Sequence, residues 1–298
     1  MDDFNADSKE KSSKFTFFSK NPLSCPVCRE EFHREDLLTG GGRLIAGQLT
    51  MDLRREYEEN KKFGVIIPMI YSVTVCPICY YATLSEDFSN PGKNKDQIEE
   101  ATLSRQTLVN ELYGEFSFKD ERNVEHGFLS YLLAIESYKL MDKRHNPTLK
   151  KAICSLRGAW LAGDIAKHYK QKVFAGIEQI LYRKAAKYYG LALAYSQNGK
   201  EPFDGTKSIG PDTDKNWGYD GFLYLAGYLN YKLSDSDKDL ERKGKTLVKV
   251  KRIMGKLYGG GRASKDKPTV ILNNAKDLYD EIRAKVKELE AELGKTLD

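Results

Sequence analysis

Apolar residues recur at three- and four-residue steps along most of the chain from about residue 95 onward. This spacing places apolar side chains on one face of an α-helix, where a neighbouring helix can bury them. The stripes are Ile98, Ala101, Leu108 and Leu112; Phe128, Tyr131, Leu132, Ile135 and Tyr138; Leu149, Ala152, Ile153, Leu156, Trp160 and Gly163; Ile177, Leu181, Ala185, Tyr188, Ala192 and Tyr195; and Leu272, Ala275, Leu278, Ile282, Val286, Leu289 and Leu293. Two further helices are expected at about 217–234 and 236–258. The pattern predicts a mainly α protein.

Long helices joined mostly by short loops are typical of a bundle or of an α-solenoid. Ala185, Tyr189 and Ala192 match the spacing of small and aromatic residues in the second helix of a tetratricopeptide (TPR) unit. A first-helix-like pattern follows at 223–227, although no clean 34-residue period accompanies it. We therefore predict a TPR-like antiparallel helical array, with an ordinary bundle as the alternative.

The front of the chain follows a different pattern. Residues 1–14 have almost no apolar content and are expected to be disordered. Residues 66–75 are rich in β-branched side chains and are expected to form one or two short strands, interrupted at Pro68. The segment 50–62 is expected to form a short polar helix. The predicted organisation is a tail at 1–14, a small zinc-ribbon-like α+β domain at 15–90 and a TPR-like helical domain at 91–298.

Two segments interrupt the helical pattern. Residues 198–216 contain several glycines and prolines and almost no apolar groups, which predicts a long loop. Gly259, Gly260 and Gly261 form a predicted turn that, with Pro268, precedes the last helix. Long loops are often functional, so 198–216 is a candidate lid over a cleft.

The composition is that of a soluble protein. Of 298 residues, 40% are hydrophobic and 31% are charged, and the net charge is +5. No stretch reaches the roughly 20 apolar residues that a membrane span needs, and the polar N-terminus lacks the apolar core of a signal peptide. We expect a cytoplasmic protein without a membrane span. The net charge permits an acidic partner but does not require one.

Four of the five cysteines form two Cys-Pro-x-Cys pairs, Cys25 with Cys28 and Cys76 with Cys79. In a reducing compartment such pairs favour metal binding over disulfides. Four thiolates make a closed tetrahedral site, which is typical of structural Zn²⁺ and leaves no open position for catalysis. Iron is the alternative ion, because tetrahedral thiolate sites accept both. The 47 residues between the pairs must loop out and return.

Two further residues are candidates near this site. His33 follows Cys28 closely and could replace a cysteine as a ligand, although an exposed histidine beside the site is the simpler interpretation. Cys154 lies within the apolar stripe of the 149–163 helix. It is expected to be a buried thiol, since free cysteines behave as small hydrophobes.

Other motifs with chemical potential are few. Gly40-Gly41-Gly42-Arg43 lacks the Gly-Lys-Ser/Thr of a phosphate-binding loop, and a flexible turn is the better interpretation. The same letters recur at 259–262, where glycine ends a helix. The sequence has no Ser-His-Asp order, no His-Glu-x-x-His and no Gly-x-Gly-x-x-Gly in a suitable context. We therefore do not expect an enzyme.

Basic residues share one face of the predicted 236–258 helix, opposite an apolar face. The basic set is Arg242, Lys245, Lys249, Arg252 and Lys256, and the apolar set is Leu247, Val250, Met254 and Leu257. A solvated face is the simpler interpretation. The functional interpretation is a set of contacts to an acidic protein, RNA or a membrane surface.

The front segment resembles a known family. The resemblance rests on Cys25-Pro26-x-Cys28-x-x-Glu31-Phe32, on Pro68-x-x-Tyr71-x-Val73-x-Val75-Cys76-Pro77-x-Cys79-Tyr80-Tyr81-Ala82, and on Asp87-Phe88. These motifs are similar to those of a bacterial family catalogued as a domain of unknown function (DUF2225). Arg29 and Tyr80 occupy positions where family members usually have glycine. The resemblance implies a zinc-ribbon-like front end and a TPR-like helical tail, and it implies no activity.

These features predict a non-enzymatic protein with a structural zinc site and a TPR-like surface for protein–protein interaction. The alternative is a zinc-ribbon nucleic-acid-binding module that uses the basic face of the 236–258 helix. An enzyme whose 198–216 loop covers a cleft is a third, weaker hypothesis.

Overall fold

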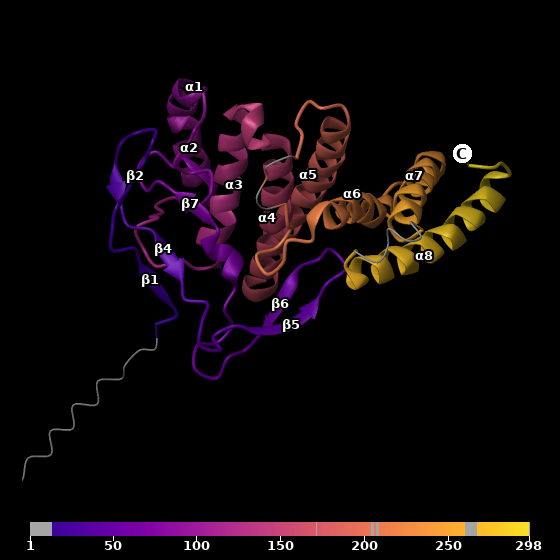
Figure 1. Ribbon diagram of the computed structural model, residues 1–298, viewed down its shortest axis with the longest axis horizontal. Helices are drawn as coiled ribbons and strands as arrows, with labels where there is room; N and C mark the ends of the chain where they lie inside the picture. The colour runs from indigo at the N-terminus through magenta and orange to yellow at the C-terminus, as the bar shows by residue number, and fades with distance from the viewer. Residues whose placement is uncertain (1–13, 171, 204–205, 207–208, 260–266, 298) are drawn as a thin grey trace, which may run out of the picture.

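Long helices stand next to one another in chain order, and short strand pairs lie to the left of them and below them in Figure 1. The computed structural model describes residues 14–170, 172–203, 206, 209–259 and 267–297. The helices are α1 (Lys95–Glu100), α2 (Thr102–Tyr113), α3 (Val124–Leu140), α4 (Pro147–Tyr169), α5 (Lys172–Gln197), α6 (Gly218–Ser234), α7 (Leu240–Tyr258) and α8 (Thr269–Leu293). The strands are β1 (Thr16–Phe18), β2 (Leu23–Ser24), β3 (Glu31–Phe32), β4 (Glu35–Leu37), β5 (Ile45–Leu49), β6 (Arg55–Glu58), β7 (Val73–Val75) and β8 (Ala82–Leu84).

Local signals explain several helix boundaries. The Asn123 side chain accepts hydrogen bonds from two backbone N–H groups in the first turn of α3, and it exchanges hydrogen bonds with His126 in a capping box. Pro147 opens α4, where its missing N–H costs nothing. Gly294 ends α8 with a φ of 63°, a conformation that glycine adopts without strain.

The predicted apolar stripes form the core. Each helix from α3 to α8 packs against the next in the chain. Along α4, the whole predicted stripe from Leu149 to Gly163 is buried, because α3 and α5 cover opposite sides of this helix. The prediction of a mainly helical protein with a small strand-containing front segment is therefore confirmed. The neighbour-to-neighbour packing is compatible with a TPR-like array, and the TPR assignment itself stays a prediction.

The strands form four antiparallel two-stranded pairs: β1 with β4, β2 with β3, β5 with β6, and β7 with β8. The pair β7–β8 and the 3₁₀ turn Pro68–Tyr71 contact α3. Polar groups of α3 reach into this layer, where the hydroxyl of Tyr131 donates a 2.7 Å hydrogen bond to the carbonyl of Met69. The front segment shares one core cluster with the helices. The predicted boundary at 90/91 stays a prediction.

The predicted polar helix at 50–62 is wrong. Residues 50–54 form the turn of a hairpin, and β6 follows it. A short polar helix gains little stability by itself, whereas the hairpin gains tertiary contacts. Arg54 forms a bidentate ion pair with Asp164 of α4, and Arg55 pairs with Asp214 at 3.0 Å.

Other boundaries differ by less. Within the predicted strand region 66–75, only Val73–Val75 is a strand, because Pro68 opens a 3₁₀ turn. Helix α7 begins at Leu240 rather than at residue 236, because Asp239 is its N-cap. The described residues between 198 and 217 contain no helix or strand, as the predicted loop requires. The predicted tail lies outside the described residues except for Lys14, and so does the predicted turn except for Gly259.

Candidate metal centre

The first cysteine pair lies in the turn between β2 and β3. Cys25 follows β2 directly, and its carbonyl accepts a 2.9 Å hydrogen bond from the backbone N–H of Arg29. Arg29 has a φ of 65°. This left-handed residue closes the turn so that Cys28 faces the same side as Cys25.

The second pair repeats this geometry between β7 and β8. The carbonyl of Cys76 accepts a 3.1 Å hydrogen bond from the N–H of Tyr80, whose φ is 53°. The same position in both turns is therefore left-handed, although neither residue is glycine. A non-glycine residue tolerates this conformation at a cost of about 1–2 kcal/mol. Arg29 and Tyr80 thus preserve the turn that glycine would form more easily.

The two turns bring all four sulfurs together. The Sγ atoms of Cys25 and Cys79 are 3.7 Å apart, and those of Cys28 and Cys76 are 3.5 Å apart. All four lie within 4.8 Å of one another. A tetrahedron with Zn–S bonds of about 2.3 Å has sulfurs about 3.8 Å apart. The four predicted ligands are therefore placed as a metal ion requires.

The centre is enclosed and its cysteines are not disulfide-bonded. Cys25, Cys76 and Cys79 are at most 2% exposed, and Cys28 is half-buried. Sulfurs 3.5 Å or more apart are far beyond a disulfide bond of about 2.05 Å. The donor set is thus four largely enclosed thiols, which suits a structural ion.

The four neighbouring thiols change one another's pKa values. Hydrogen bonds from the thiols of Cys76 and Cys79 lower the pKa of Cys25 to about 4. The pKa of Cys76 is raised, because its thiol donates hydrogen bonds to Cys25 and Cys79 and is buried. One thiolate is therefore stabilised by protons on its neighbours. A cation at the centre would replace those protons and hold all four thiolates.

Arg105 of α2 supplies a buried positive charge beside this centre. It is 2% exposed, and its Nε donates a 3.0 Å hydrogen bond to the carbonyl of Cys79. Its other donors reach the carbonyl of Ile98 and the hydroxyl of Thr102. Within the described part of the chain Arg105 forms no ion pair with a carboxylate. Burial lowers its pKa, and negative charge on the cysteines opposes that shift.

A buried arginine without a carboxylate needs another source of negative charge. Four thiolates around a divalent cation leave two negative charges uncompensated. Arg105 therefore fits the centre as its counter-charge. Periodicity does not reveal this role, since one arginine in a polar helix looks like a solvated residue.

The other candidate residues lie elsewhere. His33 is exposed, and its Nδ1 is 2.7 Å from the carbonyl of Ser19, so the described site contains cysteines only. Cys154 is fully buried in α4, and burial raises the pKa of its thiol to about 12. Gly41 and Gly42 have positive φ values, and the Gly40–Arg43 segment forms a turn. The exposed His33, the buried Cys154 and the turn at Gly40–Arg43 are as predicted, and the flexibility of that turn stays a prediction.

The predicted basic residues line the exposed face of α7. Arg242, Lys245, Lys249, Arg252 and Lys256 are all exposed. The opposite face, with Leu247, Val250, Met254 and Leu257, is buried. The structure places this face on a different part of the molecule from the cysteines, since α7 packs mainly against α6 and α8.

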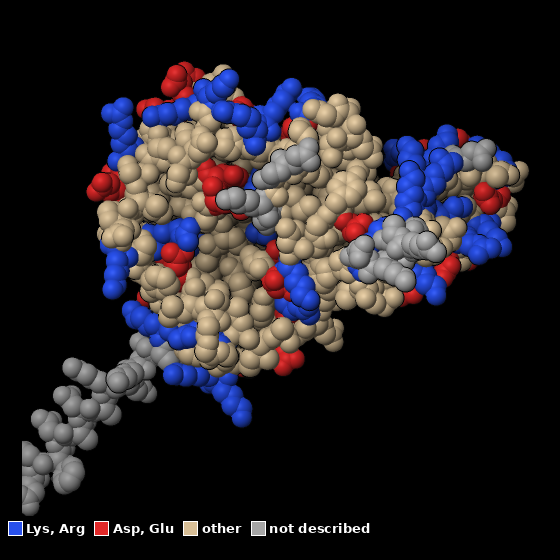
Figure 2. Space-filling model, viewed as in Figure 1, with Lys and Arg blue, Asp and Glu red and all other residues tan. Residues whose placement is uncertain are grey.

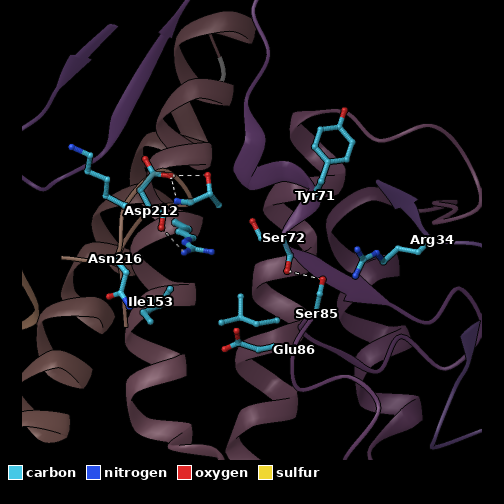
Figure 3. A pocket seen from close by; sticks show the side chains of 12 residues that line it. Arg34, Tyr71, Ser72, Ser85, Glu86, Ile153, Asp212 and Asn216 are labelled. Carbon is cyan, nitrogen blue, oxygen red and sulfur yellow. Dashed lines mark hydrogen bonds between the residues drawn. The ribbon is translucent and has the colours of Figure 1, made fainter. Parts of the chain in front are cut away.

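The 198–216 loop borders a cavity of about 410 Å³ (Figure 3). Asp212 and Asn216 come from the loop, and Ser72, Ser85 and Glu86 face them from the front segment. Their polar groups already have partners. The Ser85 hydroxyl donates to the carbonyl of Ser72 at 3.0 Å, and Glu86 pairs with Lys150.

Arg157 of α4 holds the loop at the same cavity. Its guanidinium donates to the carbonyls of Gly210, Pro211 and Asp212, and the Asp212 carboxylate accepts from the N–H of Arg55 at 2.6 Å. These contacts fasten the loop to the helix and to the β5–β6 hairpin. The cavity is therefore a polar seam between packed parts of the chain.

Fold and site together define a mainly helical protein with a four-cysteine centre that could hold a metal ion. The family model described as "uncharacterized protein conserved in bacteria (DUF2225)" matches residues 18–282. A protein of Borreliella burgdorferi described as an uncharacterized protein is 39% identical over 277 residues, which covers 93% of this chain and 99% of that protein. The chain belongs to the DUF2225 family, as the sequence motifs indicated. No solved structure matches it.

None of the described helices is both long enough and apolar enough to cross a membrane.

Proposed function

We propose that the protein is a non-enzymatic, zinc-stabilised adaptor of the cytoplasm that binds another protein. The enclosed four-cysteine centre supports a structural Zn²⁺, since sulfur spacing and burial suit a closed tetrahedral site. Iron is the alternative, and elemental analysis of protein purified from the native bacterium distinguishes the two ions. A reducing compartment keeps the thiols available for either ion.

The observation that carries the binding function is an apolar hollow where the front segment meets α3 and α4. The hollow has a volume of about 490 Å³. Most of the side chains that line it are apolar. The apolar hollow is lined by Phe15, Val65, Ile66, Ile67, Ile70, Tyr71, Val124 and Tyr169, and also by Arg122, Asn123, Asp164 and His168.

Large apolar side chains remain exposed at this place. Val65 is 57% exposed and Tyr169 is 53% exposed. In α5, the helix after Tyr169, Val173 and Ile180 are 66% and 51% exposed, and their seven-residue spacing puts them on one face. Single exposed apolar residues are ordinary, but a mostly apolar hollow whose lining includes exposed large apolar side chains has the composition of a protein interface. A protein with a protruding apolar side chain fits this site.

Site-specific photo-crosslinking in the native bacterium tests this function. The cross-linking amino acid p-benzoylphenylalanine replaces Tyr169 in one strain and Tyr219 in another. Tyr219 is a matched control, because it is a 44% exposed tyrosine that does not line the hollow. We expect one dominant protein adduct from position 169, weakened by Val65→Asp, and none of the same mass from position 219.

Two results would contradict the adaptor function. One is the absence of any protein adduct from position 169 under conditions in which the variant is folded. The other is the same set of adducts from both positions, which would indicate unspecific collisions. Circular dichroism of each variant establishes folding, so that loss of an adduct reports on the surface.

A further inference from the structure

Helix α7 contains the whole net positive charge of the protein. Between Leu240 and Tyr258 the sequence has seven lysines or arginines and one acidic residue, Glu241, so α7 has a charge of +6. The full chain has a net charge of +5, and the rest of it therefore sums to −1. Figure 2 shows basic side chains gathered over the projecting part of the molecule that α7 and α8 form.

The two halves of α7 differ in how these charges are compensated. In the first half, Arg242 pairs with Asp237, Lys243 with Asp235 and Lys245 with Glu241. In the second half, basic side chains form no ion pair with any residue that the structure describes. These residues, called the free basic set below, are Lys249, Lys251, Arg252 and Lys256. They span about 10 Å of helix, at a rise of about 1.5 Å per residue.

The apolar face of α7 is not available to a partner. Leu247, Val250, Met254 and Leu257 are at most 2% exposed, because α6 and α8 cover them. A helix that enters a membrane surface needs its apolar face free to insert. The buried face therefore argues against a lipid surface as the partner of α7.

The exposed face also differs from a protein interface. Interface centres are rich in aromatic and apolar side chains and poor in lysine. Helix α7 has no large apolar residue with an exposed side chain, and its exposed side chains are mainly lysine and arginine. Backbone phosphates of nucleic acids are the partners that such a surface fits, because they bind lysine and arginine without needing apolar contacts.

We propose that the free basic set of α7 binds the phosphate backbone of nucleic acid without sequence preference. The site is separate from the four cysteines and from the apolar hollow, so this function is additional to the adaptor function. Three or four phosphates contacted by the free basic set would release a similar number of counterions.

Fluorescence anisotropy of the full-length, metal-loaded protein with labelled 20-base-pair DNA and RNA duplexes of mixed sequence tests this proposal. Log affinity is expected to fall against log salt concentration with a slope of about −3. The variant Lys249→Glu/Arg252→Glu/Lys256→Glu should lose on the order of a hundredfold in affinity at about 0.1 M salt. The control variant Arg183→Glu/Lys184→Glu/Lys187→Glu changes the charge equally on α5, where all three residues are exposed.

The control variant should retain affinity within about threefold of the parent, since charge away from the binding surface acts weakly at this ionic strength. An equal loss in both variants would overturn the proposal, because it would show a general charge effect. Absence of duplex binding at 50 mM salt would also overturn it. So would binding of poly-glutamate or of anionic lipid vesicles by α7 when neither duplex binds.

Discussion

The hydroxyl of Tyr182 in α5 donates a 2.8 Å hydrogen bond to the carboxylate of Asp52, in the turn between β5 and β6. The same carboxylate oxygen accepts a 2.9 Å hydrogen bond from the indole N–H of Trp160 in α4. Asp52 is 5% exposed, and it lies in the insert between the two cysteine pairs. One buried carboxylate therefore joins this insert to two helices of the array.

Asp52→Ala should destabilise the protein by about 2–3 kcal/mol, because it leaves buried donors of Trp160 and Tyr182 without an acceptor. Urea denaturation followed by circular dichroism measures this change. Asp36→Ala is the control, since Asp36 is a half-buried carboxylate whose partner is the nearby Arg34. A loss no larger than that of the control would show that Asp52 does not anchor the hairpin.

The Asp52 contacts should also make stability depend on pH. Burial raises the pKa of Asp52, but hydrogen bonds from Thr50, Trp160 and Tyr182 and the charge of Lys232 outweigh it, and the net pKa is lowered. A carboxylate whose pKa is lowered on folding stabilises the folded state at pH values above its unfolded pKa of about 3.9. This stabilisation is lost as the pH falls through the folded-state pKa. Unfolding free energies of the parent and Asp52→Asn should therefore converge as the pH falls below about 4. A constant difference over that range would contradict this assignment.

Removing one of the four proposed metal ligands should destabilise the protein. Cys76→Ser should lose the bound ion and lower the melting temperature by 10 °C or more, since a structural ion contributes on the order of 10 kcal/mol. Cys154→Ser should keep one ion per chain, because Cys154 is a buried thiol of α4 away from the centre. Elemental analysis and thermal melts of the two variants give the comparison. Retention of the ion by Cys76→Ser would refute the ligand assignment.

Arg105→Met should weaken metal binding about 10- to 100-fold, the range typical of residues that support metal ligands. The variant removes the buried positive charge next to the thiolates and leaves the cysteines in place. Competition with a chromophoric chelator measures the affinity, and Arg105→Lys should recover part of it. Equal affinity in Arg105→Met and the parent protein would show that Arg105 only fills space.

Glycine substitutions at the two left-handed residues, Arg29 and Tyr80, should change the stability of the protein in opposite directions. Arg29→Gly should stabilise the protein by up to about 1 kcal/mol, because it relieves a positive φ at an exposed side chain. Tyr80→Gly relieves the same strain but loses the ring contact with Phe118 and the hydrogen bond to the carbonyl of Phe116. It should therefore destabilise the protein. Chemical denaturation of both variants measures these changes. Stabilisation by Tyr80→Gly would show that the contacts of the Tyr80 side chain do not stabilise the fold.

The cysteine cluster and the helical core could be predicted because both depend on short-range patterns. Two residues between cysteines let both sulfurs of a pair face the same point, and three- to four-residue steps determine which face of a helix is buried. Neither pattern depends on knowing the rest of the fold. Residues such as Cys25 and Leu156 were therefore found from their neighbours along the chain.

The features that could not be predicted depend on partners far along the chain. Residues 50–62 have the composition of a helix, but Asp52 and Arg54 find their partners more than 100 residues away. Arg105 is the corresponding case at the metal centre, because its partner Cys79 belongs to a turn rather than to its own helix. Long-range pairing overrides local propensity at these positions.

The 47 residues between Cys28 and Cys76 include the β5–β6 hairpin, which is bonded to α4 and α5. An ion bound by the cysteines at both ends of this insert would therefore also oppose unfolding of the helices that the hairpin contacts. Chains without the ion would spend more time open and meet proteases more often. The amount of intact protein in the bacterium would then follow the supply of the ion.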